Sequence, residues 1–124
     1  MTKDKDLTPK DFLDCGYKQF KDHLKNSSFG LQKKFTDDTG VKYFITVYVY
    51  ENFKLPRWNE YKDHMSKYSF SPDLQIRRDE IGKPTLDIQV FMEKNSTVQW
   101  LENEVNDLWL ALGGDYYELY YTAE

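Results

Sequence analysis

The pattern of apolar and polar positions marks two neighbouring strands in the first half of the chain. Phe29, Leu31 and Phe35 alternate with polar or small residues, which is the period of a strand with one buried face. Residues 41–50 are apolar or aromatic at odd and even positions alike, so we expect a central strand that is covered on both faces. The segment 37–40 between them reads Asp-Asp-Thr-Gly and predicts a hairpin turn.

Weaker alternation predicts the remaining strands. We expect a short strand between residues 17 and 24 and a second hairpin with arms at 74–78 and 86–92 around a turn at 80–84. The aromatic segment 116–121 reads as a last edge strand, whose unpaired edge also offers a route to a homodimer. Four or five strands joined by short turns form an antiparallel meander.

Helical periodicity and capping residues appear near both ends of the chain. Thr8, Pro9 and Asp11 have the pattern of a helix start, and Gly16 soon ends that helix. Ser96 and Gln99 form a capping-box pattern for a longer helix that runs to about residue 112. Its apolar positions form one stripe, which we expect to cover a face of the sheet: Val98, Leu101, Val105, Leu108, Trp109 and Leu112.

The connection between residues 52 and 73 is longer than an ordinary hairpin loop. Trp58, Tyr61 and Met65 recur at helical spacing, which predicts a short helix within residues 53–68 that packs these side chains onto the sheet. The alternative is a functional loop that closes over a ligand or presents a binding edge.

Length and pattern together predict one domain of the α+β class. The chain has 124 residues, enough for one hydrophobic core, and we read residues 1–124 as a single domain with a disordered leader at 1–7. The expected architecture is an antiparallel meander sheet of 4–5 strands covered by the C-terminal helix, with short helical segments near the N-terminus and in the 53–68 connection.

Charge is unevenly distributed along the chain. The net charge is −4, which argues against broad attraction to nucleic acid or to anionic membranes, and residues 95–124 carry six acidic residues and no basic one. The absence of a long apolar run and of an export signal, together with a single cysteine, leads us to expect a cytoplasmic protein. A bias towards Lys over Arg suggests an AT-rich genome, such as that of a phage or mobile element.

No motif in the sequence specifies a reaction. One cysteine and two histidines make no metal-binding pattern, and the glycines form no phosphate-binding loop, so we predict no catalytic residue, no metal and no cofactor. Cys15 follows the apolar residues Phe12 and Leu13, and we read it as a buried, unreactive thiol. The chain is therefore expected not to be an enzyme.

The leading functional hypothesis is a protein-interaction module that binds or inhibits a host protein. On the C-terminal helix, Trp100 projects away from the core stripe on the side of Glu104 and Asp107, and Leu110 also lies off the stripe. An exposed aromatic residue among carboxylates is typical of a binding anchor for a basic partner. The alternative is that the tail or the N-terminal segment covers Trp100.

The alternative hypothesis is binding of single-stranded nucleic acid or a nucleotide by an aromatic sheet face. Tyr48 and Tyr50 lie on one face of the predicted central strand, with Arg77 and Lys33-Lys34 on neighbouring strands and Trp58 in the long connection. Aromatic rings beside cations can stack bases and attract phosphates. The competing interpretation is that the same rings pack beneath a helix.

Overall fold

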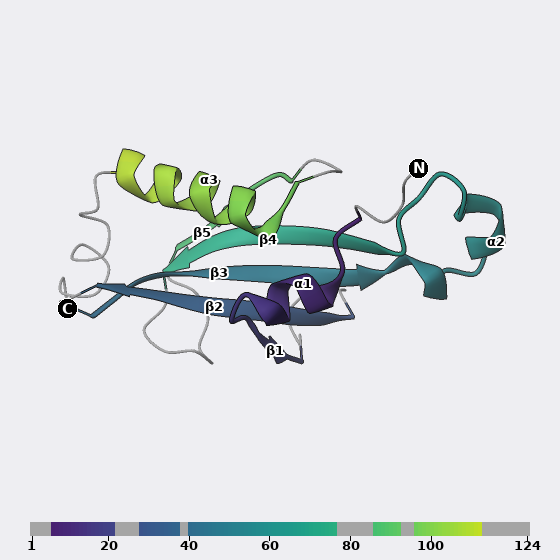
Figure 1. Cartoon of the computed structure of the whole chain (residues 1–124), viewed down its shortest axis with the longest axis horizontal. Coiled ribbons are helices and arrows are strands. Elements are labelled where there is room, and N and C mark those ends of the chain that lie inside the picture. Colours follow the sequence, from purple (N-terminus) through teal and green to yellow (C-terminus); the bar gives the residue numbers. More distant parts are fainter. Residues whose placement is uncertain (1–5, 22–27, 38–39, 77–85, 93–95, 113–124) are drawn as a thin grey trace.

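The computed structural model describes residues 6–21, 28–37, 40–76, 86–92 and 96–112. Five strands form one antiparallel sheet in the order β1-β2-β3-β4-β5 (Figure 1). The strands are β1 Lys18–Phe20, β2 Phe29–Asp37, β3 Gly40–Glu51, β4 Tyr68–Ile76 and β5 Leu86–Gln89. The helices are α1 Pro9–Asp14, α2 Trp58–Tyr61 and α3 Val98–Ala111, with a 3-10 turn, η2, at Asn52–Lys54. The predicted α+β meander is confirmed, while the turn at 80–84 and the strand at 116–121 fall outside the described residues.

Strand β3 is the central strand, as its sequence predicts. Residues 43–49 are buried on both faces of the sheet, and β3 pairs with β2 on one side and β4 on the other. Its register with β4 runs from Phe44 opposite Gln75 to Glu51 opposite Tyr68. The pairing therefore continues to the last residue of β3, and the chain leaves the sheet only after Glu51.

Strand β4 begins at Tyr68, whereas the sequence pattern places the start of this strand at Leu74. Pro72 within β4 masks the pattern, because proline is depleted in strand interiors. Its carbonyl accepts a hydrogen bond from the Val90 nitrogen at 2.8 Å, just past the end of β5 at Gln89. The missing N–H of Pro72 therefore falls where the pairing of β4 with β5 is already ending.

Helix α3 covers one face of the sheet with the stripe that its periodicity predicts. Val98, Leu101, Val105 and Trp109 are buried, and they share a core cluster with residues such as Leu31, Tyr43, Ile45, Leu74 and Ile76. The capping residue is Thr97 and not Ser96, because the Thr97 side chain accepts a hydrogen bond from the Trp100 nitrogen at 3.0 Å. No described helix has the length and apolarity needed to cross a lipid bilayer.

Helix α1 packs against the same core through Phe12, whose ring meets the Tyr17 ring edge-on at 5.2 Å between centroids. Gly16 adopts a φ of 97°, a left-handed conformation that only glycine takes readily, and turns the chain into β1. The prediction that Cys15 is buried is wrong. Cys15 is the C-terminal cap of a helix of 6 residues that buries only Phe12, so its thiol is exposed.

Candidate functional site

Residues 52–67 join β3 to β4 and project beyond the end of the sheet, away from α3 (Figure 1); we call them the tip loop. None of its residues belongs to the core cluster. Leu55, Tyr61 and Met65 are 41%, 37% and 38% exposed. The predicted packing of Trp58, Tyr61 and Met65 onto the sheet is therefore wrong, because α2 is a helix of only 4 residues held beyond the last paired residues of β3 and β4.

The base of the tip loop is fastened by one buried side chain. The Asn52 backbone nitrogen donates to the Lys67 carbonyl at 2.7 Å. The Asn52 amide Nδ2 donates to the Ser66 carbonyl at 3.0 Å and to Ser69 Oγ at 2.8 Å. The Phe53 ring adds an edge-on contact with the Tyr68 ring at 5.5 Å. The loop is thus held at its base, while its outer part carries the exposed apolar groups.

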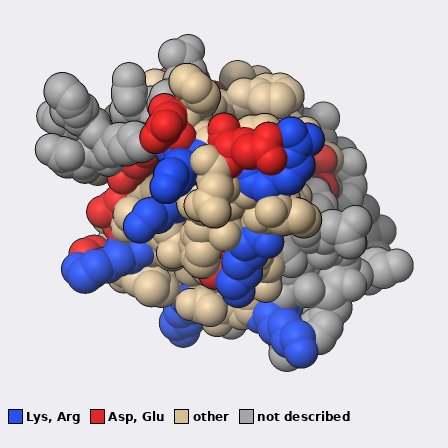
Figure 2. Space-filling model, turned by 90° about the vertical axis from the view of Figure 1, so that its right-hand side faces the viewer, with Lys and Arg blue, Asp and Glu red and all other residues tan. Residues whose placement is uncertain are grey.

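Positive charge predominates in the tip loop. Its basic residues are Lys54, Arg57, Lys62 and Lys67, and its acidic residues are Glu60 and Asp63, on a chain whose net charge is −4. Lys54 pairs with Glu51 at 2.9 Å, and Arg57 pairs with Glu60. Hydrogen bonds from these cations lower the pKa of both glutamates. Figure 2, which looks onto this end of the molecule, shows basic side chains spread over the face and acidic ones towards its upper part.

A cleft of about 570 Å³ lies between the tip loop and the segment that precedes α1. A second hollow of about 300 Å³ adjoins it and shares Leu7, Met65 and Ser66 with it. These volumes are within the range of ligand pockets. The cleft is lined by Asp6, Leu7, Thr8, Trp58, Lys62, Asp63, Met65, Ser66 and Lys67. The second hollow adds His64, Tyr68, Ser69, Phe70 and Met92.

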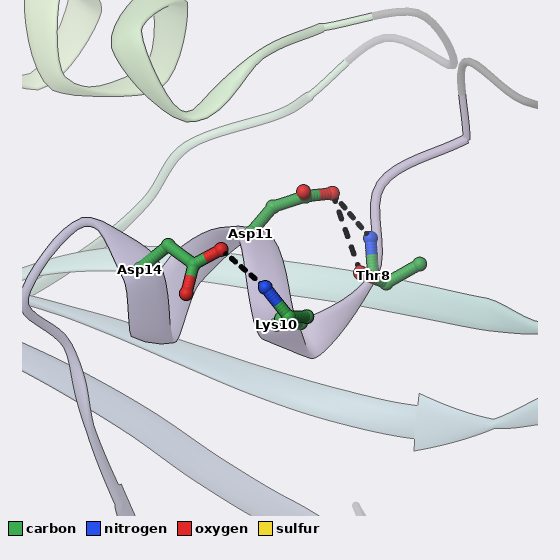
Figure 3. A network of polar contacts seen from close by, with 4 residues as sticks. All are labelled: Thr8, Lys10, Asp11 and Asp14. Atoms are coloured by element: carbon green, nitrogen blue, oxygen red, sulfur yellow. Dashed lines mark hydrogen bonds and ion pairs between the residues drawn. The ribbon is translucent and has the colours of Figure 1, made fainter.

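The wall formed by residues 6–8 is held from both sides. Asp11 Oδ2 accepts hydrogen bonds from the Thr8 nitrogen at 2.9 Å and from Thr8 Oγ1 at 3.4 Å (Figure 3). On the other side Ser66 Oγ donates to Asp6 Oδ2 at 3.0 Å, and Leu7 packs against the core cluster. Of the leader expected at 1–7, only Asp6 and Leu7 lie within the described residues. Their contacts make the helix start and the tip loop two walls of one cleft.

The residues predicted as a protein-binding site on α3 differ in exposure. Trp100 is half-buried and packs against the core cluster, whereas Glu104, Asp107 and Leu110 are exposed. Leu110 is 61% exposed, so of the two apolar residues predicted there it is more exposed than Trp100. We call Glu104, Asp107 and Leu110 the helix face. Trp100 is not part of the helix face, because it is half-buried and is therefore not a fully exposed anchor.

A third carboxylate of α3 is part of the attachment of this helix to the sheet. Glu102 Oε2 accepts a hydrogen bond from the Tyr17 hydroxyl at 3.0 Å and pairs with Lys33 Nζ at 3.0 Å. Burial and, secondly, the charge of Glu102 raise the pKa of Tyr17 well above its ordinary value. The same two causes raise the pKa of Tyr43 to about 12. Glu102 is thus engaged within the fold and not presented to a partner.

Of the residues predicted to stack bases, Tyr48 and Tyr50 lie on one face of β3, but Trp58 lies apart from them. Tyr48 is 4% exposed, and its hydroxyl accepts a hydrogen bond from Gln75 Nε2 at 3.1 Å. Tyr50, on the same face of β3, is half-buried, while Trp58 lines the cleft beyond the sheet. Arg77 lies outside the described residues.

The interior of that sheet face is polar. Thr46 Oγ1 donates to Gln75 Oε1 at 2.8 Å and accepts from Gln32 Nε2 at 3.0 Å. Gln75 Nε2 also approaches Asp87 Oδ2 at 3.3 Å. These bonds join side chains from β2, β3, β4 and β5 into one row across the sheet. Such a row satisfies buried amides and hydroxyls within the fold, so its groups are engaged with one another.

No family model, curated protein or solved structure matches this chain. Within the described residues, no cluster of three or more His, Cys, Asp and Glu side chains could hold a metal ion. What the site offers is an apolar, partly basic surface with a cleft behind it.

The sequence pattern names part of this site and misses the rest. Trp58 and His64 belong to residues 53–68, for which the sequence predicts either a helix packed on the sheet or a functional loop. Leu7 and Ser66 carry no signal, because they are far apart in the sequence and meet only when the chain is folded. Met65 carries a misleading signal, since helical spacing assigns it to the sheet.

Proposed function

We propose that this chain is a protein-interaction module, with no reaction of its own, that docks a partner protein on the tip loop. The observation that supports this proposal is the exposure of Leu55, Tyr61 and Met65 on a loop outside the core. Apolar side chains gathered at one projecting place mark interaction surfaces, and loops on a rigid scaffold commonly carry binding residues. A small phage or mobile-element protein that binds or inhibits a host protein would fit this role.

Two features favour a protein partner over nucleic acid. Lys54 and Arg57 are each paired with a nearby glutamate, so their attraction for phosphate is reduced. The ring of Tyr48, which the nucleic-acid hypothesis requires, is buried. Binding of single-stranded nucleic acid or a nucleotide therefore draws less support from the geometry than binding of a protein.

The helix face is a second candidate docking surface for a protein. Leu110 is exposed between Asp107 and Ala111, and α3 carries carboxylates but no basic residue. This surface would suit a basic partner, since charge complementarity selects partners and speeds their association. It has one large exposed apolar side chain, while the tip loop has three.

Affinity capture with matched variants tests the proposal. The tagged chain, a Leu55→Ser/Tyr61→Ser variant and a Leu110→Ser variant are each used to capture partners from a lysate of the native cell, with and without nuclease. We expect a stoichiometric protein that resists nuclease, survives Leu110→Ser and is weakened about 30-fold by the double variant, the loss typical of a binding hot spot.

Each other outcome assigns the function elsewhere. Loss with Leu110→Ser alone would move the docking surface to the helix face. Capture that disappears with nuclease would favour nucleic acid. The two variants replace only exposed residues, so circular dichroism is expected to show the fold of the unmodified chain in both.

A further inference from the structure

We infer that the outer edge of β5 pairs with the same edge of a second copy of this chain, so that the two sheets join into one. The homodimer edge expected from the sequence, residues 116–121, lies outside the described residues, whereas β5 offers a free edge within them. This pairing goes beyond docking on the tip loop and does not depend on it. The direction of the backbone groups of β5, the alternation of its side chains and the register that a two-fold axis allows all support it.

Every second residue of β5 turns its backbone N–H and C=O away from the sheet. The Val90 nitrogen donates to the carbonyl of Pro72, which continues the β4–β5 register opposite Val90. Val90 and Ile88 therefore direct these groups towards β4, because the direction alternates along an antiparallel strand. The same groups of Asp87 and Gln89 point to the outer edge, where no described residue pairs with them. Free edges of this kind are templates for pairing with another chain.

The side chains of this edge alternate between a half-buried and an exposed set from residue 86 to residue 92. The half-buried set packs against the core cluster on the face that α3 covers: Leu86, Ile88, Val90 and Met92. The exposed set lies on the opposite face: Asp87, Gln89 and Phe91. Phe91 is 78% exposed, the largest exposure among the large apolar side chains of the described residues. Protected edges commonly carry several charges or a proline, whereas Asp87 is the one charged residue of this segment, which has no proline.

One antiparallel register pairs the whole segment 86–92 with itself. A two-fold axis through Gln89 places Gln89 opposite its own copy and Asp87 opposite Phe91 of the second copy. Asp87 then does not face its own copy, so this register avoids the repulsion of like charges placed directly opposite each other. On the face that α3 covers, the register pairs apolar residues with one another: Ile88 with Val90, and Leu86 with Met92.

A second copy fits this edge better than an unrelated segment does. The occupant must offer free backbone groups on one side and apolar side chains at every second position on the face of α3. Any other chain needs a sequence of that pattern, whereas the second copy has it by symmetry over a paired length of about 23 Å.

The joined sheet carries both α3 helices on one face, because the two-fold axis is perpendicular to the sheet. Its two tip loops project from opposite ends, since paired antiparallel strands run in opposite directions. The dimer therefore presents two tip loops at once, and a partner that engages both gains affinity through bivalency.

Amide hydrogen exchange and sedimentation of the full chain test whether the edge is free and what fills it. At about 20 μM we expect the Asp87 and Gln89 amides to exchange at least tenfold faster than those of Ile88 and Val90. At about 1 mM the Asp87 and Gln89 amides should slow, while sedimentation shows a dimer. Slow exchange at both concentrations would overturn the inference, because a segment of the same chain then occupies the edge. A monomer at the higher concentration would overturn it as well.

Substitutions at Gln89 test the register. Gln89→Lys and Gln89→Glu each place like charges opposite one another at the axis and should weaken self-association about fivefold. An equimolar mixture of the two variants should associate more tightly than either variant alone, because Lys then lies opposite Glu. Gln19→Lys, an exposed change on the edge strand β1, is the matched control and should have no effect. A mixture that associates no better than its components would contradict the register.

Gln89→Pro separates backbone pairing from side-chain contacts. The variant lacks the outward N–H, and proline is tolerated at such a position of an edge strand, so we expect the fold to be retained and the dimer to be lost. Self-association that persists in Gln89→Pro, or that Leu110→Ser abolishes, would place the contact on another surface and overturn the inference. Leu55→Ser/Tyr61→Ser should leave the dimer intact, and its effect on capture tests the proposed function separately.

Discussion

Helix α3 and the tip loop both present apolar and charged side chains to solvent, yet they relate to the core in opposite ways. Four residues of α3 are buried, and Glu102 ties the helix to Tyr17 and Lys33. The tip loop contributes no residue to the core, and Asn52 holds only its base. Removal of α3 side chains should therefore unfold the protein, whereas the outer tip loop can change with little effect on stability.

The two regions also differ in charge. Helix α3 carries acidic and no basic residues, while basic residues outnumber acidic ones in the tip loop. Similar helical spacing of apolar residues occurs in both segments, but α3 has 14 residues and α2 has 4. A long helix can bury a stripe along a sheet, whereas a single turn beyond the sheet has no surface on which to pack.

The largest expected effect separates Trp109 from Trp58. Trp109→Ala should lower the free energy of unfolding by about 3–5 kcal/mol, because it leaves a cavity beside Tyr43 in the core. Trp58→Ala should lower it by less than about 1 kcal/mol, since Trp58 lies outside the core cluster. Urea unfolding measures both, and similar losses would show that the tip loop is part of the cooperative core.

Raising the pH from 10 to 12 should lower the free energy of unfolding by about 2–3 kcal/mol, through ionisable groups next to α3. Burial, then Glu102, raises the pKa of Tyr43 to about 12 and that of Tyr17 further. Above pH 10 the unfolded chain loses these protons while the folded chain keeps them, so stability falls as pH rises.

Unfolding titrations across that pH range measure this effect. Tyr43→Phe should reduce the slope of stability against pH, because the variant lacks one of the two tyrosine hydroxyls whose ionisation is linked to unfolding. Trp58→Ala should leave the slope unchanged. A free energy of unfolding that stays constant over this pH range in the unmodified chain would contradict the attachment of α3 to the sheet through Glu102.

A smaller effect is expected at the base of the tip loop. Asn52→Ala removes hydrogen bonds to Ser66 and Ser69 and should cost about 1–2 kcal/mol. Hydrogen exchange should accelerate within 52–67 more than in β2, because the loop opens locally. Uniform acceleration in both segments would show that Asn52 supports the whole sheet.

The smallest expected effect lies on the helix face. Leu110→Ser should change the free energy of unfolding by less than about 0.5 kcal/mol, because Leu110 is exposed and lies outside the core cluster. Chemical denaturation provides the measurement. A clear loss of stability would mean that Leu110 is covered in solution, and the comparison between the two surfaces would then rest on the tip loop alone.

The candidate site was harder to predict than the fold. The meander, the central strand and the stripe of α3 follow from periodicity, which records the faces of an element that are buried. The site depends on where elements end. Pro72 conceals residues 68–73 of β4. The β3–β4 pairing extends far enough that Tyr61 and Met65 lie beyond the sheet onto which their spacing predicts that they pack.

The sequence by itself determined the α+β class, the central place of β3 and the inward stripe of α3, because each is encoded in the local spacing of apolar and polar residues. Only the tertiary structure decided that Trp100 packs against the core while Tyr61 stays exposed, and that Leu7 and Ser66 line one cleft. The physical reason is that exposure and cleft formation depend on which distant segments lie alongside a residue, and local periodicity carries no record of them.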